Sequence, residues 1–175
     1  MYSSAHTRQS ELLDPTRAAA LQVALGLAPS VTFDAPLPPF FHHLYFWSPE
    51  PPENLGRDGH PKVGTGLIPD HGLPRRMWAG GRLVFHRPLV AGHPARRVSI
   101  VEDTQHKQGR SGALAFVTLR HDFHQNNQLC LSEWQKIVYR EDPNPTATAR
   151  DIPRARTDES DAQVVRFDPT LLFRY

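Results

Sequence analysis

The side chains best suited to chemistry lie in several short stretches of the sequence, not in one motif. His42 and His43 follow two phenylalanines, and His121 and His124 are separated by two residues in His-Asp-Phe-His. Neighbouring residues of an extended chain point to opposite sides, so His42 and His43 could not easily bind one ion. We expect one of them to be buried and hydrogen-bonded and the other exposed. His121 and His124 should also point to opposite strand faces, so the sequence predicts no metal site.

Neither potential nucleophile lies in a catalytic pattern. Ser111 lies in Gly-Arg-Ser-Gly, which resembles a nucleophile turn only loosely and lacks the strand–turn–helix setting. We interpret it as part of a hairpin loop. Cys130 is the single cysteine, which excludes an intrachain disulfide, and it is expected to be a small buried residue. We assign no catalytic residue in this chain.

Glu133 and Gln135 are the polar residues that most suggest a binding site. By strand alternation they share a face with Leu131, Ile137 and Tyr139. Polar groups on an apolar face must be paired, solvated or directed into a cavity, and a substrate tunnel would provide such a cavity. The alternative is a β-bulge near Trp134 that moves them to the other face.

The segment Arg75–Gly81 has two interpretations. Ordering consecutive glycines is costly in chain entropy, so the presence of Gly80 and Gly81 in this segment requires a structural explanation. They could let the backbone approach closely beside an apolar wall formed by Met77 and Trp78. Alternatively they form a β-bulge, and Trp78 is an ordinary core aromatic. Arg75 and Arg76, just before them, either meet a phosphate or lie at a solvated loop edge.

Composition excludes several functional classes. The 175 residues suggest one domain plus extensions. The 20 Lys and Arg residues nearly balance 18 Asp and Glu residues, which argues against nucleic acid as the main partner. No apolar run reaches about 18 residues, and no signal pattern opens the chain, so neither a membrane span nor secretion is expected. A single cysteine fits a reducing cytoplasm.

The N-terminal third predicts one helix and long irregular stretches. Asp14 and Pro15 have the residue types of an N-cap and a first helical position, and Gly26 of a stop, which predicts a helix over Pro15–Leu25. A short strand is expected over Ala5–Leu12. The proline-bracketed aromatic segment Pro36–Pro52 should form one helical turn or an extended piece over the core. Asn54–Gly72 is a long loop.

The following residues predict an antiparallel sheet. Alternation predicts four strands in a meander, with hairpin loops over 107–112 and at Asn126-Asn127. Such long strands must twist and coil, and a coiled sheet with one helix in its concave face is a hotdog fold. The fold class is therefore α+β, with long Pro-rich loops. We divide the chain into one hotdog domain (1–141), a linker (142–162) and a segment (163–175) that begins an absent second hotdog or docks as a tail.

Several segments resemble a known family. These are LPPFFHHLYFWSPEP, LGRDGHPKVG, GLPRRMWAGGRLVFHRPLVAG, GRSGALAFVTLRHDF and EWQKIVYRE. From about Leu12 to Tyr175 the chain resembles the N-terminal half of MaoC-like hydratases, with the mesaconyl-CoA and itaconyl-CoA hydratases nearest. That family joins two hotdog units, and the second carries the hydratase motif just beyond a stretch similar to Leu172–Tyr175.

The resemblance implies an acyl-CoA hydratase or dehydratase, a hydro-lyase, of which this chain is the substrate-channel half without the catalytic motif. The implied partners are a CoA thioester and either a second copy in a homodimer or another hotdog unit, with no cofactor. Two alternatives are a stand-alone acyl-thioester binding module and a hotdog thioesterase. The expected substrate-binding residues are Arg75, Arg76, Met77, Trp78, Gly80, Gly81, Glu133 and Gln135.

Overall fold

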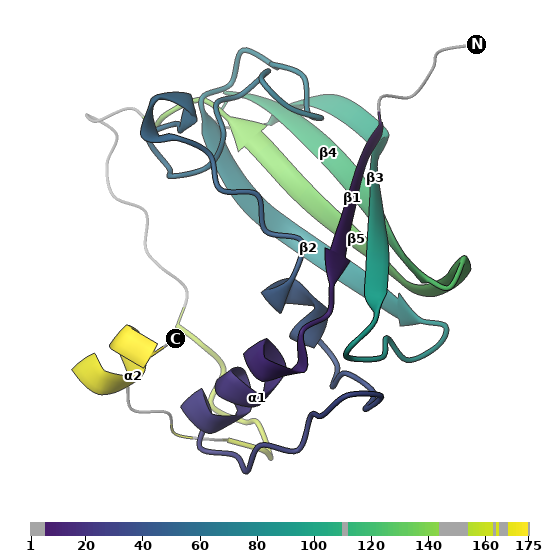
Figure 1. The fold of residues 1–175 in the computed structure, drawn as a ribbon. Coiled ribbons are helices and arrows are strands. Elements are labelled where there is room, and N and C mark those ends of the chain that lie inside the picture. Colours follow the sequence, from purple (N-terminus) through teal and green to yellow (C-terminus); the bar gives the residue numbers. More distant parts are fainter. Residues whose placement is uncertain (1–5, 110–111, 144–153, 163, 165–167, 175) are drawn as a thin grey trace.

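The computed structural model describes residues 6–109, 112–143, 154–162, 164 and 168–174, and it contains one curved antiparallel sheet (Figure 1). No helix within these ranges is long and apolar enough to cross a membrane. The elements are β1 (His6–Leu12), α1 (Pro15–Ala24), the 3₁₀ turns η1 (Phe41–Leu44) and η2 (Pro52–Asn54), β2 (Arg75–Phe85), β3 (Pro94–Gly109), β4 (Gly112–Gln125), β5 (Gln128–Arg140) and α2 (Pro169–Arg174).

The five strands lie in the order β1-β3-β4-β5-β2, with antiparallel pairing throughout. The predicted first strand and the β3-β4-β5 meander are confirmed. The prediction that β2 pairs with β3 is wrong, because β2 lies beside β5 at the far edge. The connection between β2 and β3 does not form a tight hairpin. Instead Pro36 bridges Val90, and the Leu37 amide donates to the Leu89 carbonyl, 2.7 Å away.

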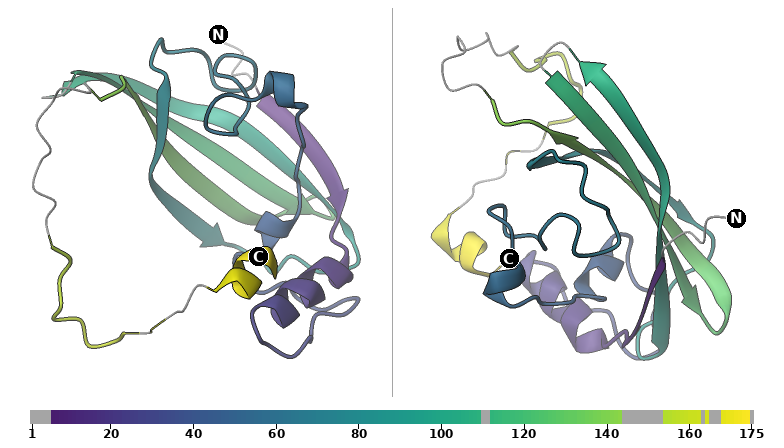
Figure 2. Two further views of the ribbon diagram at one scale, coloured as in Figure 1. Left: turned by 90° about the vertical axis from the view of Figure 1, so that its left-hand side faces the viewer. Right: turned by 90° about the horizontal axis from the view of Figure 1, so that it is seen from above.

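Helix α1 follows its sequence signals closely. The Asp14 side chain accepts a hydrogen bond from the Thr16 amide at 2.9 Å, Pro15 is the first helical residue, and Gly26 follows the end with a φ of +76°. This hydrogen bond and the Thr16 hydroxyl lower the pKa of Asp14. The helix packs on η1 and lies on the same side of the sheet as the long loops, at the end where β1 finishes (Figure 2).

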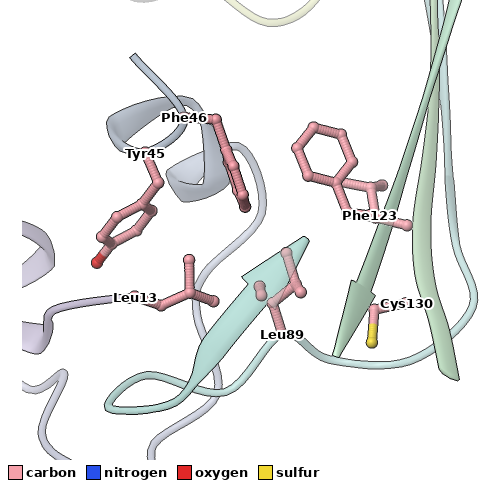
Figure 3. Close-up of a cluster of buried hydrophobic side chains, with 8 residues drawn as sticks. Leu13, Tyr45, Phe46, Leu89, Phe123 and Cys130 are labelled. Atoms are coloured by element: carbon pink, nitrogen blue, oxygen red, sulfur yellow. The ribbon is translucent and has the colours of Figure 1, made fainter. Parts of the chain in front are cut away.

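Residues 36–74, here called the cover segment, lie over the concave face of the sheet (Figure 2). The expected single helical turn is η1, and the residues that follow it, Tyr45 and Phe46, are buried in one cluster with Leu13, Leu89 and Phe123 (Figure 3). Farther along, Leu73 packs with strand residues such as Val117. Burial of these apolar groups holds the cover segment on the sheet.

The remaining expectations concern the Asn126-Asn127 turn, Cys130 and residues outside the described ranges. Asn126 and Asn127 have φ values of +50° and +61°, as a two-residue hairpin turn requires. Cys130 is buried, as expected, and burial raises its pKa. Ser111 and linker residues 144–153 lie outside the described residues, and the proposed domain boundaries stay predictions.

Candidate functional site

A cleft of about 740 Å³ lies on the concave face, between the cover segment and the central strands. It is partly polar, which is unusual for the inner face of a sheet that carries the core. Its polar and charged groups come from three places: α1, η1 and strands β3 to β5. The lining residues are Arg17, His42, His43, Leu44, Tyr45, Phe46, Trp47, Arg97, His121, Phe123, Glu133 and Gln135.

Glu133 is the centre of the polar network in this cleft. Its residue is only 6% exposed, and it lies opposite His121 in the pairing of β4 with β5. Gln135 Nε2 donates to Glu133 Oε1 at 2.9 Å, His42 Nε2 lies 3.4 Å from Oε2, and His43 Nε2 lies 3.8 Å from Oε1. The buried carboxylate is therefore surrounded by polar partners, as a buried charge requires.

The position of Glu133 and Gln135 on the inner face was one of two expectations, and the structure selects it. The pairing of β4 with β5 runs without a register shift through Trp134, so no bulge moves these residues to the other face. They lie opposite His121 and Leu119 respectively, and both line the cleft. The polar pair on an apolar face is explained by internal hydrogen bonding combined with a cavity.

His42 and His43 confirm one expectation and contradict another. His42 is buried at 3% exposure and His43 is half-exposed, as expected. However, both imidazoles approach the same carboxylate, and their ring centroids are 4.1 Å apart. They lie in a 3₁₀ turn, where successive side chains are about 120° apart and not on opposite sides. The turn is bracketed by Phe40 and Phe46, whose φ values of +70° and +63° are rare for bulky residues.

Burial shapes the charge states in the cleft. Burial alone would raise the pKa of Glu133, but hydrogen bonds from His42 and Gln135 and the charges of His43 and His42 lower it to about 2. Burial lowers the pKa of His43, and the charge of His42 lowers it further. Burial also lowers the pKa of His121, whose Nδ1 lies 2.7 Å from the Ser99 hydroxyl oxygen. At neutral pH the site thus combines the ionised carboxylate of Glu133 with the imidazoles of His43 and His121, whose pKa values are lowered.

The ligand-type atoms of His42, His43 and Glu133 lie within 4.8 Å of one another, close enough for a cation such as zinc to bridge them. Two features oppose this use. Glu133 is already hydrogen-bonded by Gln135, and Arg97 lines the same cleft with its positive charge. We therefore interpret the three side chains as a hydrogen-bonded network.

A second, more apolar pocket of about 330 Å³ adjoins the cleft, because His42 lines both. Its other walls come from the Pro-rich start of the cover segment, the connection after β2, and Leu131 of β5. A partly polar cleft and a more apolar pocket thus share His42 as a wall. This combination suits a short acyl group joined to a polar carrier.

The glycine pair lies in a β-bulge, as one of the two interpretations of this segment held. The pairing of β2 with β5 shifts between Trp78 and Gly80, which leaves Ala79 as the extra residue. Gly80 has a φ of +157°, and a Cβ at Gly81 would lie 3.1 Å from the Trp134 carbonyl oxygen. Trp78 is not a core aromatic, because it is 73% exposed, and Met77 is 38% exposed.

The two arginines before the bulge are not in a loop but begin strand β2. Arg76 forms an ion pair with Asp58 at 3.1 Å and lines a pocket of about 270 Å³ that also contains Arg97 and His121. Arg75 lies opposite Arg140 at the strand end. Of the eight predicted binding residues, Glu133 and Gln135 thus meet in the cleft, Arg76 lines the neighbouring pocket, and the others lie along β2.

Replacing Gly80 with alanine is expected to lower the free energy of unfolding by about 1–2 kcal/mol, because an L side chain rarely adopts its φ. Gly66→Ala is a matched control, since nothing lies within 4 Å of a Cβ there and its φ is ordinary. Urea unfolding of both variants measures the difference. Equal stability of the two variants would show that the bulge does not need glycine.

Sequence reasoning did not identify Arg97 or Ser99 as site residues, and it considered His121 only as a metal ligand, a role that it rejected. In β3 the alternation of Val98 and Ile100 drew attention to one face, whereas Arg97 and Ser99 lie opposite Phe123 and His121 on the concave face. The available signal was the same one that identified Glu133: polar residues in register with an apolar strand face.

Comparison with known proteins places the chain in a family. Residues 40–175 match the model of the family described as hydroxyacyl-thioester dehydratase type 2. The chain is 42% identical over 161 residues to mesaconyl-C(4)-CoA hydratase of Chloroflexus aurantiacus, a match that covers 90% of this chain and 57% of that protein. The chain thus spans little more than half the length of this relative.

Solved structures show the same fold at low identity. The ChsH1-ChsH2 complex of Mycobacterium tuberculosis matches with a TM-score of 0.58 and 14% identity, covering 83% of this chain and 90% of that chain. HtdX of the same organism matches with a TM-score of 0.55 and 16% identity, over 97% of this chain and 60% of that chain. The α+β hotdog fold expected from the sequence is confirmed, and the chain belongs to the hydroxyacyl-thioester dehydratase type 2 family.

Proposed function

We propose that this chain is the acyl-binding half of a hydro-lyase that adds water to, or removes it from, the double bond of an acyl-CoA thioester such as mesaconyl-CoA or itaconyl-CoA. The observation that carries the proposal is the cleft on the concave face, together with a more apolar pocket that shares His42 as a lining residue. The family and the mesaconyl-C(4)-CoA hydratase relative supply the class of substrate.

The chemistry of the cleft favours binding over catalysis. Hydration of an enoyl thioester needs a general base for water and donors for the thioester oxygen as it gains negative charge. Glu133 is a poor base, because its pKa is about 2 and polar side chains approach both of its oxygens. We therefore assign this carboxylate to organising the cleft, and we assign no catalytic residue within this chain.

The predicted binding residues of β2, at the edge of the sheet, fit the same proposal. Arg75 and Arg76 would bind phosphates of CoA, and Met77 and Trp78 would form one wall of the acyl tunnel beside Gly80 and Gly81. The exposure of Trp78 supports a partner at this edge, because an exposed tryptophan on an unpaired strand edge is costly to leave in water. The partner would be a second copy of this chain or another hotdog unit. Acyl-CoA substrates and a single cysteine fit a cytoplasmic setting.

The test measures binding and turnover on the purified chain. Crotonyl-CoA and mesaconyl-CoA should bind more tightly than free CoA in calorimetric titration, while the enoyl-thioester absorbance stays constant over hours. Turnover at an ordinary enzymatic rate would contradict the assignment of a non-catalytic half. Release of CoA thiol would instead indicate a thioesterase. Equal affinity for free CoA and for the thioesters would show that the chain does not bind the acyl group.

A further inference from the structure

Arg97 is a partly buried guanidinium that pairs with no carboxylate among the residues that the structure describes. It lies on β3 opposite Phe123, on the concave face. Arg97 Nη2 donates a hydrogen bond to the neutral side-chain amide oxygen of Gln9, 2.7 Å away. Within the described ranges Arg97 forms no ion pair. Burial of a charge without an opposite charge is unfavourable, so the partial burial of this guanidinium requires an explanation.

The nearby carboxylates are already engaged. Glu133 is approached by His42, His43 and Gln135, as described above. Glu11 pairs with Arg17 at 2.5 Å and accepts a hydrogen bond from the Phe46 amide. Glu11 and Glu133 act on Arg97 only from beyond ion-pair distance, where they partly offset the effect of burial in lowering its pKa.

Arg97 also lines two cavities, the partly polar 740 Å³ cleft and the more apolar 270 Å³ pocket. Its ring neighbour is Phe46, with the guanidinium carbon 5.7 Å from the ring centroid. The aromatic ring restricts the side chain while its remaining N–H groups stay available. A guanidinium in this state is suited to bind a planar anion through two parallel hydrogen bonds.

We propose that Arg97 binds the free carboxylate of an acyl group that carries its thioester at the other end, so that the chain selects monothioesters of dicarboxylic acids over simple enoyl thioesters. This inference rests on the proposed function and names the feature of the substrate that the cleft reads. Among the cationic side chains of the cleft, Arg17 is neutralised by Glu11, which leaves Arg97 for the ligand.

The test compares two ligands that differ in a single group. Fumaryl-CoA carries a carboxylate where crotonyl-CoA carries a methyl group, and both contain the same CoA. Calorimetric titration of the whole chain is expected to show about 10- to 100-fold weaker binding of fumaryl-CoA by Arg97→Gln, since a hydrogen-bonded charge pair is lost. Crotonyl-CoA should bind to Arg97→Gln within about threefold of the original affinity.

Two further variants make the test specific. Arg97→Lys keeps the charge but loses the fork geometry, so it should bind fumaryl-CoA with intermediate affinity. Arg120→Gln is the matched control, because Arg120 precedes the inward-facing His121 on β4, lies on the opposite face of the sheet, and pairs there with Glu102 and Asp122 at 2.9 Å and 3.1 Å. It should leave both affinities unchanged. Arg97→Lys also serves if Arg97→Gln fails to fold.

The outcomes separate this inference from the proposed function. If Arg97→Gln weakens both thioesters equally, the anion at Arg97 is a CoA phosphate, and the inference is overturned while the proposed function stands. If Arg97→Gln changes neither affinity, Arg97 does not contact the ligand, and the inference is again overturned. If the original chain binds neither thioester, the proposed function fails, and the inference fails with it.

Discussion

Replacing Glu133 with glutamine is expected to lower the free energy of unfolding at pH 7 by about 2 kcal/mol. Lowering the pKa of this carboxyl from 4.5 to about 2 corresponds to at most about 3–4 kcal/mol, since one pKa unit is about 1.4 kcal/mol. Solvent in the open cleft reduces that figure. Glutamine keeps the shape of the side chain but removes the charge that His42 and His43 face.

The pH dependence gives this prediction a distinctive form. Because the folded-state pKa of Glu133 is lowered, its contribution is fully present above pH 4.5 and is lost as the pH falls from 4.5 towards 2. The difference in stability between the original chain and Glu133→Gln should therefore shrink over that range. Urea unfolding from pH 7 to pH 3 measures it, with exposed Glu53→Gln as control. A difference that stays constant with pH would contradict the proposed charge network.

Replacing Phe123 with alanine is expected to lower the free energy of unfolding by about 3–5 kcal/mol, the range for a large buried aromatic. Phe123 is 2% exposed, and its ring lies edge-on to Phe46, with centroids 5.4 Å apart (Figure 3). It also lies edge-on to His42, with centroids 5.1 Å apart. The substitution would remove the contact that joins the cover segment to β4. Thermal unfolding should show a correspondingly large fall in Tm.

Phe116→Ala is the matched control, because Phe116 lies on the same strand but is only partly buried and stacks near Lys107. Its loss should be less than half as large. If both variants lost the same stability, the cover segment would not depend on Phe123. The Phe123 variant should also weaken thioester binding, since His42 loses one of its supporting rings.

The parts of the fold that depend on local patterns could be predicted from the sequence. Asp14, Pro15 and Gly26 define the limits of α1 within one residue, because capping acts over one turn. The alternation along β4 correctly predicts which side chains are buried, from Ala115 to Phe123. Local alternation also placed Glu133 and Gln135 on the inner face.

The parts that depend on distant contacts could not be predicted in the same way. Nothing near β2 indicates that it pairs with β5 and not with β3, because edge position depends on the whole sheet. The meeting of His42 with Glu133 joins residues 91 positions apart. It required knowing both that the histidines lie in a 3₁₀ turn and that the turn rests on β5. Arg97 was overlooked because the nearby carboxylates, Glu11 and Glu133, are engaged with other side chains, and these pairings join residues far apart in the sequence.

The carboxylate and the two imidazoles of the Glu133 network come from different elements, which affects how the cleft can change between related chains. The carboxylate is supplied by a central strand whose replacement would disturb the pairing on both sides, whereas both imidazoles are supplied by one short turn. Substitutions or length changes in that turn can therefore retune acidity and shape at the cleft while the scaffold stays intact. Related chains that handle different acyl groups are expected to vary most in this turn and least in the strand beneath it.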